Sequence, residues 1–254
     1  MVKDRLGAGG GGSRRARGAR RAKDMARSPG PSALDRRQIQ AAWNAIRHYR
    51  AGAALAATAD HGARQLIVVS GWACEIRRSP DGRRQIVSFV LPGDALDLGV
   101  LSPERDVHAL TRLEAIEVAR LLPEEPAGRA EVEEVVQQAI RDREDRVFDQ
   151  MVRLGRMNAK ERVLNLLLEF HDRLSAVGLT NQDTFRLPLT QEVFADALGL
   201  SLVHVNRTLS QLRGEGKIVL GCGEITILRP QSLAEAASYL RRPEGRPLLS
   251  GMWG

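Results

Sequence analysis

The chain has 254 residues, of which 43% are hydrophobic and 27% are charged, the composition of an ordinary soluble globular protein. This composition excludes a collagen-like, a purely coiled-coil or a largely disordered chain. No apolar run of about 18 residues occurs, so no membrane-spanning helix is expected. Two cysteines are too few for a disulfide framework or a four-thiolate cluster. We therefore expect a cytoplasmic protein.

The net charge of +7 comes from the first 30 residues. Residues 1–30 hold nine Lys and Arg against two Asp and Glu, whereas the other 224 residues carry 29 basic and 29 acidic side chains. This leader is rich in Gly and Arg and has little to bury, so we expect it to be disordered. It could add nonspecific affinity for phosphates, or translation could begin at Met25. In both cases the charge does not describe a folded surface.

The segment from Pro31 onward has a helical pattern. Ile39, Trp43 and Ile46 are spaced by four and then three residues, as on one face of an α-helix.

From about residue 65 to residue 119 the hydrophobic period changes to two. Trp72, Cys74 and Ile76 alternate with their neighbours in the way that is typical of a half-buried strand. Residues 79–82 place Pro and Gly where a type I turn favours them. Further strands are expected at 66–69, 85–91, 107–110 and 115–119. Several short strands at this spacing indicate a small β-barrel or jelly roll.

Residues 130–155 show a long helical pattern with a single apolar stripe. Such a narrow stripe favours a dimer seam, although a helix packed on its own domain would also produce it. The residues expected in the seam are Val132, Val136, Ala139, Val147, Met151 and Leu154. A second helix is expected from Ala159 to Leu174.

The stretch 189–212 predicts a helix-turn-helix, because two short helical patterns meet at Gly199, a residue that tolerates the positive φ of the turn. Ala195 allows the two helices to approach closely, and Ser201 can cap the second helix. The expected shared core consists of Phe194, Leu198, Leu200, Val205 and Leu209. Residues 217–228 predict a β-hairpin that turns at Gly221-Cys222-Gly223, so the module is winged. The alternative is an αα-hairpin with no role in DNA binding.

In a helix-turn-helix the second helix lies in the major groove, and its N-terminal half meets the base edges. Since Val205 and Leu209 point inward, the residues expected to read bases are Leu202, Val203, Asn206 and Arg207. Arg207 suits a bidentate contact to guanine, Asn206 suits adenine, and Leu202 or Val203 suits a thymine methyl group. The residues expected to contact phosphates are Thr190, Gln191, Ser201, His204, Ser210 and Lys217.

A small β-barrel, a long helix and a winged helix-turn-helix, in this order, resemble the Crp/Fnr family of bacterial transcription regulators. The resemblance covers about residues 35–240 and includes the strings at 71–74, 81–86, 91–94 and 204–209. It implies a homodimer joined through the long helix, on a palindromic DNA site whose halves lie ~34 Å apart. It also implies that the barrel is a sensor acting through a hinge near 156–158, and that RNA polymerase is a further partner.

The sensor departs from the cyclic-nucleotide binders of this family. Those members carry Gly-Glu followed later by Arg-Ser, Arg-Thr or Arg-Ala, whereas this chain has Gly93-Asp94 and Arg105-Asp106. An iron–sulfur cluster needs about four thiolates, and the domain has only Cys74. Haem ligation by Cys74 or His108 stays open, but we expect no cofactor and no metal.

The predicted fold class is therefore α+β. The expected parts are a leader (1–30), a sensor (31–128), a dimerisation helix (129–156), a winged helix-turn-helix (157–240) and a flexible tail (241–254). The expected function is that of a transcription regulator that binds double-stranded DNA sequence-specifically as a homodimer. The alternative is a sensor protein whose C-terminal module docks on protein. An enzyme is not expected, because the five His form no metal-spaced pair and no nucleophile elbow occurs.

Overall fold

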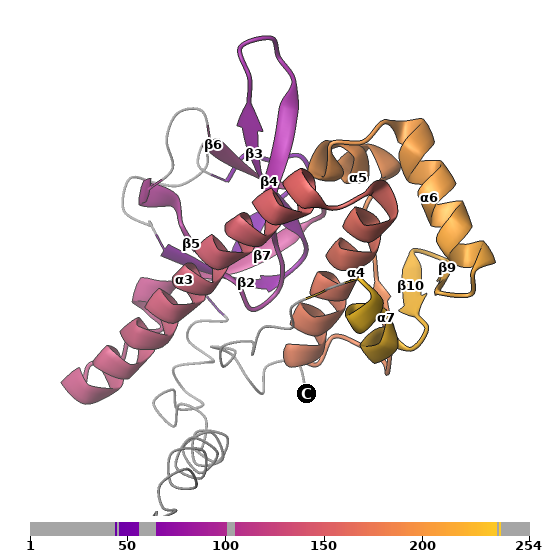
Figure 1. Cartoon of the computed structure of the whole chain (residues 1–254). Helices are drawn as coiled ribbons and strands as arrows, with labels where there is room; N and C mark the ends of the chain where they lie inside the picture. Colours follow the sequence, from indigo (N-terminus) through magenta and orange to yellow (C-terminus); the bar gives the residue numbers. More distant parts are fainter. Residues whose placement is uncertain (1–43, 45, 56–64, 101–104, 238, 240–254) are drawn as a thin grey trace, which may run out of the picture. The chain divides into compact units, whose positions relative to one another are not determined.

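Strands come first along the chain, a long helix follows, and small helices with a β-hairpin come last (Figure 1). The computed structural model describes residues 44, 46–55, 65–100, 105–237 and 239, which belong to the unit Ala33–Gly254. The expected leader 1–30, the tail 241–254 and most of the helix expected after Pro31 lie outside the described residues. Ile46 directly precedes strand β1 (Arg47–Tyr49), so the expectation of a helix is wrong at this residue.

Two antiparallel sheets, with strand orders β1-β7-β2-β5 and β4-β3-β6, form the N-terminal domain. The strands after β1 are β2 (Gln65–Ser70), β3 (Ala73–Arg78), β4 (Arg84–Val90), β5 (Ala95–Asp97), β6 (Arg105–Ala109) and β7 (Leu113–Glu117). Short 3-10 turns, η2 (Leu98–Val100) and η3 (Val118–Arg120), follow β5 and β7. The predicted strands are confirmed as β2, β3, β4, β6 and β7, whereas β1 and β5 were not predicted.

Residues 73–76 of strand β3 are buried on both faces, which corrects the expectation of a half-buried strand. Ala73 faces the interior between the sheets, whereas Cys74 and Ile76 belong to a core that the barrel shares with the C-terminal helices. Glu75 is also fully buried, and it forms ion pairs with Arg105 and Arg143. The alternation was real, but the face of Ala73 and Glu75, which was expected to meet water, is buried in the barrel, and the C-terminal helices cover the face of Cys74 and Ile76.

Helix α3 (Pro126–Arg156) begins at a proline, and the Glu125 carboxylate caps it by accepting hydrogen bonds from the first backbone N–H groups. Val132 and Val136 are each 1% exposed, and they pack with Ile67 and Ile116 of the barrel. Ala139 packs against the same cluster. The N-terminal half of the expected seam is therefore corrected: its apolar side chains are already buried by their own domain.

Helix α4 (Ala159–Ala176) follows after a short break and starts with a capping box formed by Asn158 and Glu161. Its apolar face joins the core shared with β3 and β4, where Phe170 lies edge-on to Trp72 and Phe89, each with a ring-centroid distance of 5.0 Å. The predicted second helix is thus confirmed, and it also covers the outer face of the sheet.

The C-terminal domain continues with β8 (Thr184–Arg186), α5 (Gln191–Leu198), α6 (Leu202–Gly214), β9 (Ile218–Gly221), β10 (Glu224–Ile227) and α7 (Pro230–Ala236). The three strands form one antiparallel sheet of order β8-β10-β9. The helix-turn-helix and its hairpin are confirmed, whereas β8 and α7 were not predicted. Within the described part of the chain, every helix is too short or too polar to cross a membrane.

Candidate nucleic-acid interface

The turn between α5 and α6 is built as its sequence predicts. Thr190 caps α5 by accepting a hydrogen bond from the Val193 N–H, and Ser201 caps α6 by accepting one from the His204 N–H, each at 3.3 Å. Gly199 has a φ of +61°, in the left-handed region where a side chain is strained. The residues that make the turn are therefore short polar caps around one glycine.

A small apolar core fixes the angle between the two helices. Phe194 and Leu198 of α5 are buried against Val205 and Leu209 of α6. Leu200 and Ala195 are partly buried and pack on the same cluster. This core buries the inner face of α6, so the opposite face remains exposed and accessible to a ligand.

The four residues expected to read bases are all exposed on the outer face of α6. The side chain of Val203 is 77% exposed, and that of Leu202 is also exposed. Asn206 and Arg207 lie one turn further on, and both are exposed. The face thus combines two aliphatic side chains with an amide and a guanidinium group, a set that can recognise base edges in a major groove.

Of the residues expected to contact phosphates, two are helix caps, three are exposed side chains that make no cap, and Lys217 belongs to an ion-pair cluster described below. Thr190 and Ser201 are exposed, but their side-chain oxygens already cap the two helices. Gln191, His204 and Ser210 are exposed on the same module. Thr190, Gln191, Ser201 and His204 lie at the N-terminal ends of α5 and α6, where the helix dipole favours an anion, whereas Ser210 lies in the C-terminal half of α6.

Lys217 belongs to a small surface ion-pair cluster. Its Nζ lies 2.9 Å from Glu215, and the Nζ of Lys160 lies 2.6 Å from the same carboxylate. Hydrogen bonds from Lys160 and Lys217 lower the pKa of Glu215 to about 2, and the carboxylate in turn raises the pKa of Lys217. Two lysines face one acid, so the cluster keeps an excess positive charge at the C-terminal end of α6.

The wing turns at Cys222 and Gly223, which have φ values of +52° and +77°. Cys222 is exposed and is a free thiol. Val219 of β9 is an exposed aliphatic side chain beside this turn. The predicted tight turn at Cys222 is thus confirmed.

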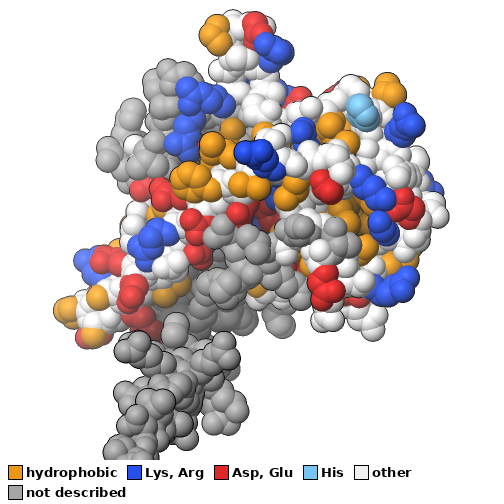
Figure 2. Space-filling model, in the orientation of Figure 1, with side chains coloured by type: hydrophobic (Ala, Val, Ile, Leu, Met, Phe, Trp, Pro, Cys, Tyr) orange, Lys and Arg blue, Asp and Glu red, His pale blue; other side chains and the backbone are white. Residues whose placement is uncertain are grey.

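The C-terminal half of α3 carries exposed apolar side chains. Phe148 and Met151 are 62% and 64% exposed, and Val152 is also exposed. Figure 2 shows hydrophobic side chains in a band along this part of the helix. Of the expected seam residues, Met151 lies in this stripe, while Val147 and Leu154 are partly buried at its edge.

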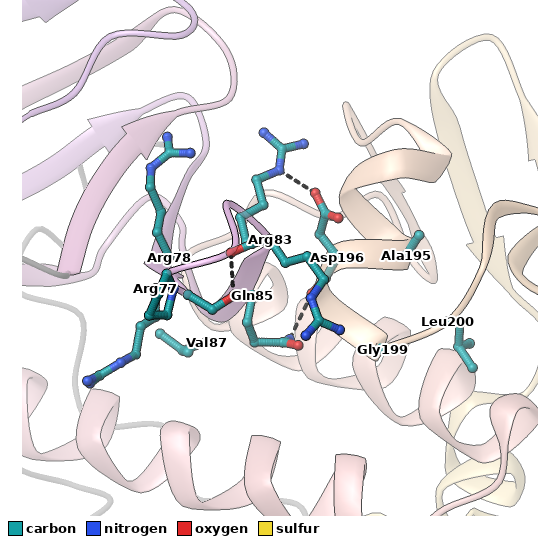
Figure 3. Close-up of a pocket in the computed structure, with 12 residues that line it drawn as sticks. Arg77, Arg78, Arg83, Gln85, Val87, Ala195, Asp196, Gly199 and Leu200 are labelled. Carbon is teal, nitrogen blue, oxygen red and sulfur yellow. Dashed lines mark hydrogen bonds and ion pairs between the residues drawn. The ribbon is translucent and has the colours of Figure 1, made fainter.

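Side chains from the barrel and from α3 hold the last turn of α5. Gln150 of α3 donates to the Ala197 carbonyl at 2.5 Å, and Gln85 of β4 donates to the Asp196 and Ala197 carbonyls at 2.7 and 3.1 Å. Arg84 forms an ion pair with the Asp196 carboxylate. Figure 3 shows Gln85 and Asp196 side by side at this contact. The last carbonyls of a helix have no partner within it, so these contacts satisfy the helix and position it against the barrel.

A crevice of about 1050 Å³ lies beside this contact, between the β3–β4 hairpin and α5. The sequence offered no signal for the contact, because the glutamines stand far from α5 along the chain.

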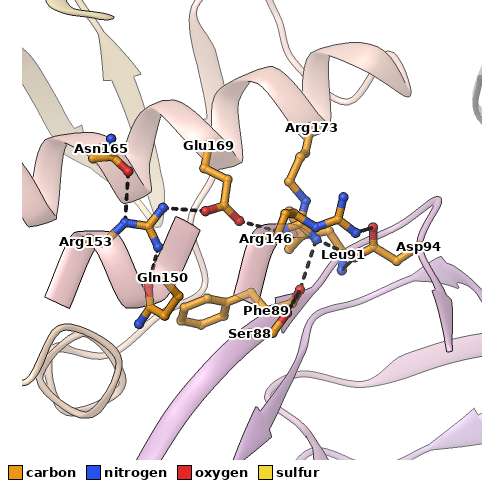
Figure 4. Close-up of polar contacts among 10 residues, drawn as sticks. All are labelled: Ser88, Phe89, Leu91, Asp94, Arg146, Gln150, Arg153, Asn165, Glu169 and Arg173. Atoms are coloured by element: carbon orange, nitrogen blue, oxygen red, sulfur yellow. Dashed lines mark hydrogen bonds and ion pairs between the residues drawn. The ribbon is translucent and has the colours of Figure 1, made fainter. Parts of the chain in front are cut away.

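A second contact between the domains is a buried chain of ion pairs (Figure 4). Asp94 of the barrel pairs with Arg146 of α3, at 3.0 Å, and with Arg173 of α4. Arg173 continues to Glu169 at 2.8 Å, and Glu169 pairs with Arg153 of α3 at 2.6 Å. Barrel, long helix and C-terminal domain are thus linked by charged groups that have little access to water.

The two buried carboxylates remain ionised in this setting. Burial alone would raise the pKa of Asp94, but Arg173 and Arg146 outweigh it and hold that pKa below its ordinary value. In the same way Arg153 and Arg173 lower the pKa of Glu169 against the effect of burial. The chain of ion pairs therefore depends on charge on every member.

The same contacts occupy the positions at which this barrel departs from nucleotide binders. Asp94 is engaged by two arginines, and Arg105 donates to Glu75 at 2.5 Å. A cyclic-nucleotide phosphate would have to displace these pairs, and Asp106 beside Arg105 adds a negative charge. The residues present therefore do not fit this ligand.

The two residues considered for haem ligation, Cys74 and His108, are register partners on β3 and β6. Cys74 packs in the core that the barrel shares with α4, and burial raises the pKa of its thiol to about 12. His108 lies 2.9 Å from the Asp106 carboxylate. Among the residues that the structure describes, no group of three or more potential metal ligands comes together.

Comparisons with known proteins match both halves of the chain. Residues 46–122 match the profile of the cyclic nucleotide-binding domain, and residues 161–236 match that of the Crp-like helix-turn-helix domain. The nitrogen fixation regulation protein FixK of Bradyrhizobium diazoefficiens is 34% identical over 165 residues, which cover 63% of this chain and 68% of that protein.

Two further proteins extend this similarity. The transcriptional activator protein FnrL of Cereibacter sphaeroides is 34% identical over 68% of this chain and 72% of its own length. The structure of FixK2 from Bradyrhizobium japonicum aligns with a TM-score of 0.57 and 27% identity, over 75% of this chain and 95% of that one.

Proposed function

Because the chain belongs to the Crp/Fnr family of DNA-binding transcription regulators, we propose that it binds a palindromic operator as a homodimer. The observation that carries this proposal is the outer face of α6. It exposes Leu202, Val203, Asn206 and Arg207, while Val205 and Leu209 anchor the helix from behind. A rigid helix with one free, chemically varied face can enter a major groove without rearrangement.

Within each half-site the contacts divide into positioning and reading. Gln191, His204, Ser210 and Lys217 meet phosphates and set the register. Thr190 and Ser201 bring the phosphate backbone to the helix ends that they cap. Arg207 reads guanine, Asn206 reads adenine, and Leu202 or Val203 packs on a thymine methyl group.

The second copy of the chain packs against the exposed stripe of α3. Phe148, Met151 and Val152 would otherwise leave apolar area in water. Two α3 helices joined here place two α6 helices about one turn of DNA apart, ~34 Å. The modest positive charge around α6 fits this arrangement, because two weak half-site contacts together give a strong one.

The regulator acts where the DNA is, in the cytoplasm, and RNA polymerase is its proposed partner once it is bound. No catalytic step is part of this function. The alternative, a C-terminal module that docks on protein, has no specific observation in its favour.

The experiment that tests the proposal is a selection of bound fragments from genomic DNA with the purified full-length chain. We expect enrichment of an inverted repeat whose half-sites have centres ~10 base pairs apart. Affinity for that site should fall steeply with salt, because bound phosphates release counterions. A protein-docking module would enrich no sequence, and that result would contradict the proposal.

A further inference from the structure

A crevice of about 460 Å³ lies where one end of the barrel meets the C-terminal domain, away from α6 and from the interior of the barrel. Its barrel side includes residues 69–72, Pro92 and residues 111–112, and its other side includes Leu174, Leu179, Arg186 and Pro188. Pockets that hold small molecules have volumes of roughly 300–1,000 Å³. The crevice therefore has the size of a small-molecule site.

The barrel wall of this crevice is preformed. A Cβ on Gly71, which has a φ of +85°, would lie 2.1 Å from the Arg112 carbonyl oxygen, so only glycine allows the two loops to meet. The Trp72 N–H donates to the Thr111 hydroxyl at 2.9 Å, and the Leu110 N–H donates to the Trp72 carbonyl at 2.8 Å. These contacts fix the backbone at Trp72, which lines the crevice.

The opposite wall is fixed by the end of α4. The Leu179 N–H donates to the Leu174 carbonyl and the Gly178 N–H donates to the Ser175 carbonyl, at 2.8 and 3.1 Å. These two hydrogen bonds form a Schellman motif, and Leu174 and Leu179, which it joins, both line the crevice. Leu179 nevertheless remains partly exposed to solvent. The crevice thus offers a rigid apolar surface with room for a ligand.

The charge of the lining has one sign. Arg112 and Arg186 both line the crevice, and none of its described lining residues is acidic. Arg112 forms an ion pair with Glu114 at 3.6 Å, and Glu114 does not line the crevice. Glu224 is the register partner of Arg186 in the C-terminal sheet and does not line the crevice either. An anion in the crevice would meet guanidinium groups from both domains, one from each wall.

We propose that this crevice binds a small organic anion, with an apolar body packed on Trp72, Leu174 and Leu179 and an acidic group held by Arg112 and Arg186. Trp72 also lies edge-on to Phe170 of α4, 5.0 Å away. The ligand therefore touches both the barrel and the helix that carries the DNA-binding module. It acts as an effector by stabilising one arrangement of the two domains. The effector role rests on the proposed function.

The test uses the fluorescent aromatic sulfonate ANS as the probe and octanoate as a non-fluorescent competitor, with the full-length chain. We expect saturable ANS binding of one molecule per chain, displaced by octanoate. Leu179→Asp places a negative charge in the crevice, and the double variant Arg112→Gln, Arg186→Gln removes the guanidinium groups. Each should weaken ANS binding roughly tenfold. All three positions are exposed, so the variants should fold.

Matched controls separate the crevice from other surfaces. Val219→Asp and Arg83→Gln make the same chemical changes on exposed side chains elsewhere, and they should leave ANS binding unchanged. Phe148→Ser removes an aromatic ring from the exposed stripe of α3 and should also have no effect. Loss of ANS binding in Phe148→Ser but not in Leu179→Asp would overturn the proposal.

The effector role is tested by measuring ANS affinity with and without saturating operator DNA. Linkage requires that a ligand which changes DNA affinity has its own affinity changed by DNA to the same extent. We expect a difference of roughly fivefold. Equal affinities in a chain that binds the operator would overturn the effector role and leave the proposed DNA-binding function intact.

Discussion

Single residues decide the turn and the face of the helix-turn-helix. Gly199 allows the backbone to enter the left-handed region, Ser201 starts the second helix, and Val205 turns the helix so that its other face is exposed. Specificity then depends on a few exposed side chains. In the proposed complex we expect Arg207 to carry the largest share, since a guanidinium group can donate two hydrogen bonds to one guanine.

Substituting Arg207 by alanine should weaken binding to the selected operator by ~1–3 kcal/mol and relax the preference at one base pair per half-site. The physical reason is the loss of a bidentate hydrogen bond in the major groove. Binding titrations against operators changed one base pair at a time would measure it. Arg213→Ala, on the same helix but near its C-terminal end, is the matched control, and it should weaken all sequences alike. An unchanged base preference in Arg207→Ala would remove this residue from base reading.

The two cysteines should differ in reactivity. Cys222 is exposed at the wing turn, whereas Cys74 is buried and the pKa of its thiol is raised to about 12. The thiolate is the reactive form, so the aromatic disulfide DTNB should label one thiol per native chain and both after denaturation. Cys222→Ser should abolish the native reaction. Rapid labelling of the native Cys222→Ser chain would show that Cys74 is accessible.

At the scale of elements, α3 has two different faces along its length. Its N-terminal half is buried on the barrel through Val132 and Val136, and its C-terminal half exposes Phe148, Met151 and Val152. The apolar residues of α3 are therefore divided between a surface buried on the barrel and a surface exposed to solvent. The C-terminal half still packs on the barrel and on α4, but through the buried polar side chains of Arg146, Gln150 and Arg153, so its apolar side chains lie on the opposite face of the helix.

Charge substitutions should separate the two halves of α3. Phe148→Glu or Met151→Glu should give folded monomers whose operator affinity is lower by ~100-fold or more, because each half-site would be bound alone. Val136→Glu should instead destabilise the chain by about 4 kcal/mol, since it buries an unpaired charge in the barrel core. Sedimentation equilibrium and urea unfolding measure the two effects. A Met151→Glu variant that remains dimeric would place the interface elsewhere.

Across the whole molecule, the barrel, α3 and the C-terminal domain are joined by polar contacts as well as by a shared apolar core. The ion pairs from Asp94 to Arg153 and the glutamine contacts on α5 both cross from one domain to the other. Buried charges of this kind are costly when one partner is removed. Removing a barrel partner of these contacts is therefore expected to destabilise the packing of the barrel against the C-terminal domain.

Asp94→Asn should lower the free energy of unfolding at neutral pH by ~3–5 kcal/mol, because Arg146 and Arg173 would lose their shared partner. The folded pKa of Asp94 and of Glu169 is below the ordinary carboxyl value. Their contribution is thus complete above about pH 5 and is lost as the pH falls.

Urea midpoints between neutral pH and acid should show this loss in the unmodified chain and a weaker pH dependence in Asp94→Asn. Asp81→Asn, at an exposed ion pair with Arg83, is the matched control and should change stability by at most about 0.5 kcal/mol. An unchanged pH dependence in Asp94→Asn would show that the buried carboxylate does not contribute.

The sequence alone was sufficient for features that depend on neighbours along the chain. Strand periodicity, the caps at Thr190 and Ser201, the glycine at the turn and the wing are local, and the residues that specify them lie within a few positions of one another. The exposed face of α6 could be predicted for the same reason. Once Val205 and Leu209 are assigned inward, helical geometry places Asn206 and Arg207 outward.

Only the tertiary structure decided which apolar faces are covered, and by what. Cys74 and Ile76 looked like one side of a half-buried strand, but α4 covers the face on which they lie, and Val132 looked like a seam residue although the barrel already buries it. The contacts of Gln85 and Gln150 with α5, and the ion pairs of Asp94, join residues far apart along the chain. Periodicity reports that a side chain is apolar on a given face; which surface lies against that face depends on the path of the whole backbone.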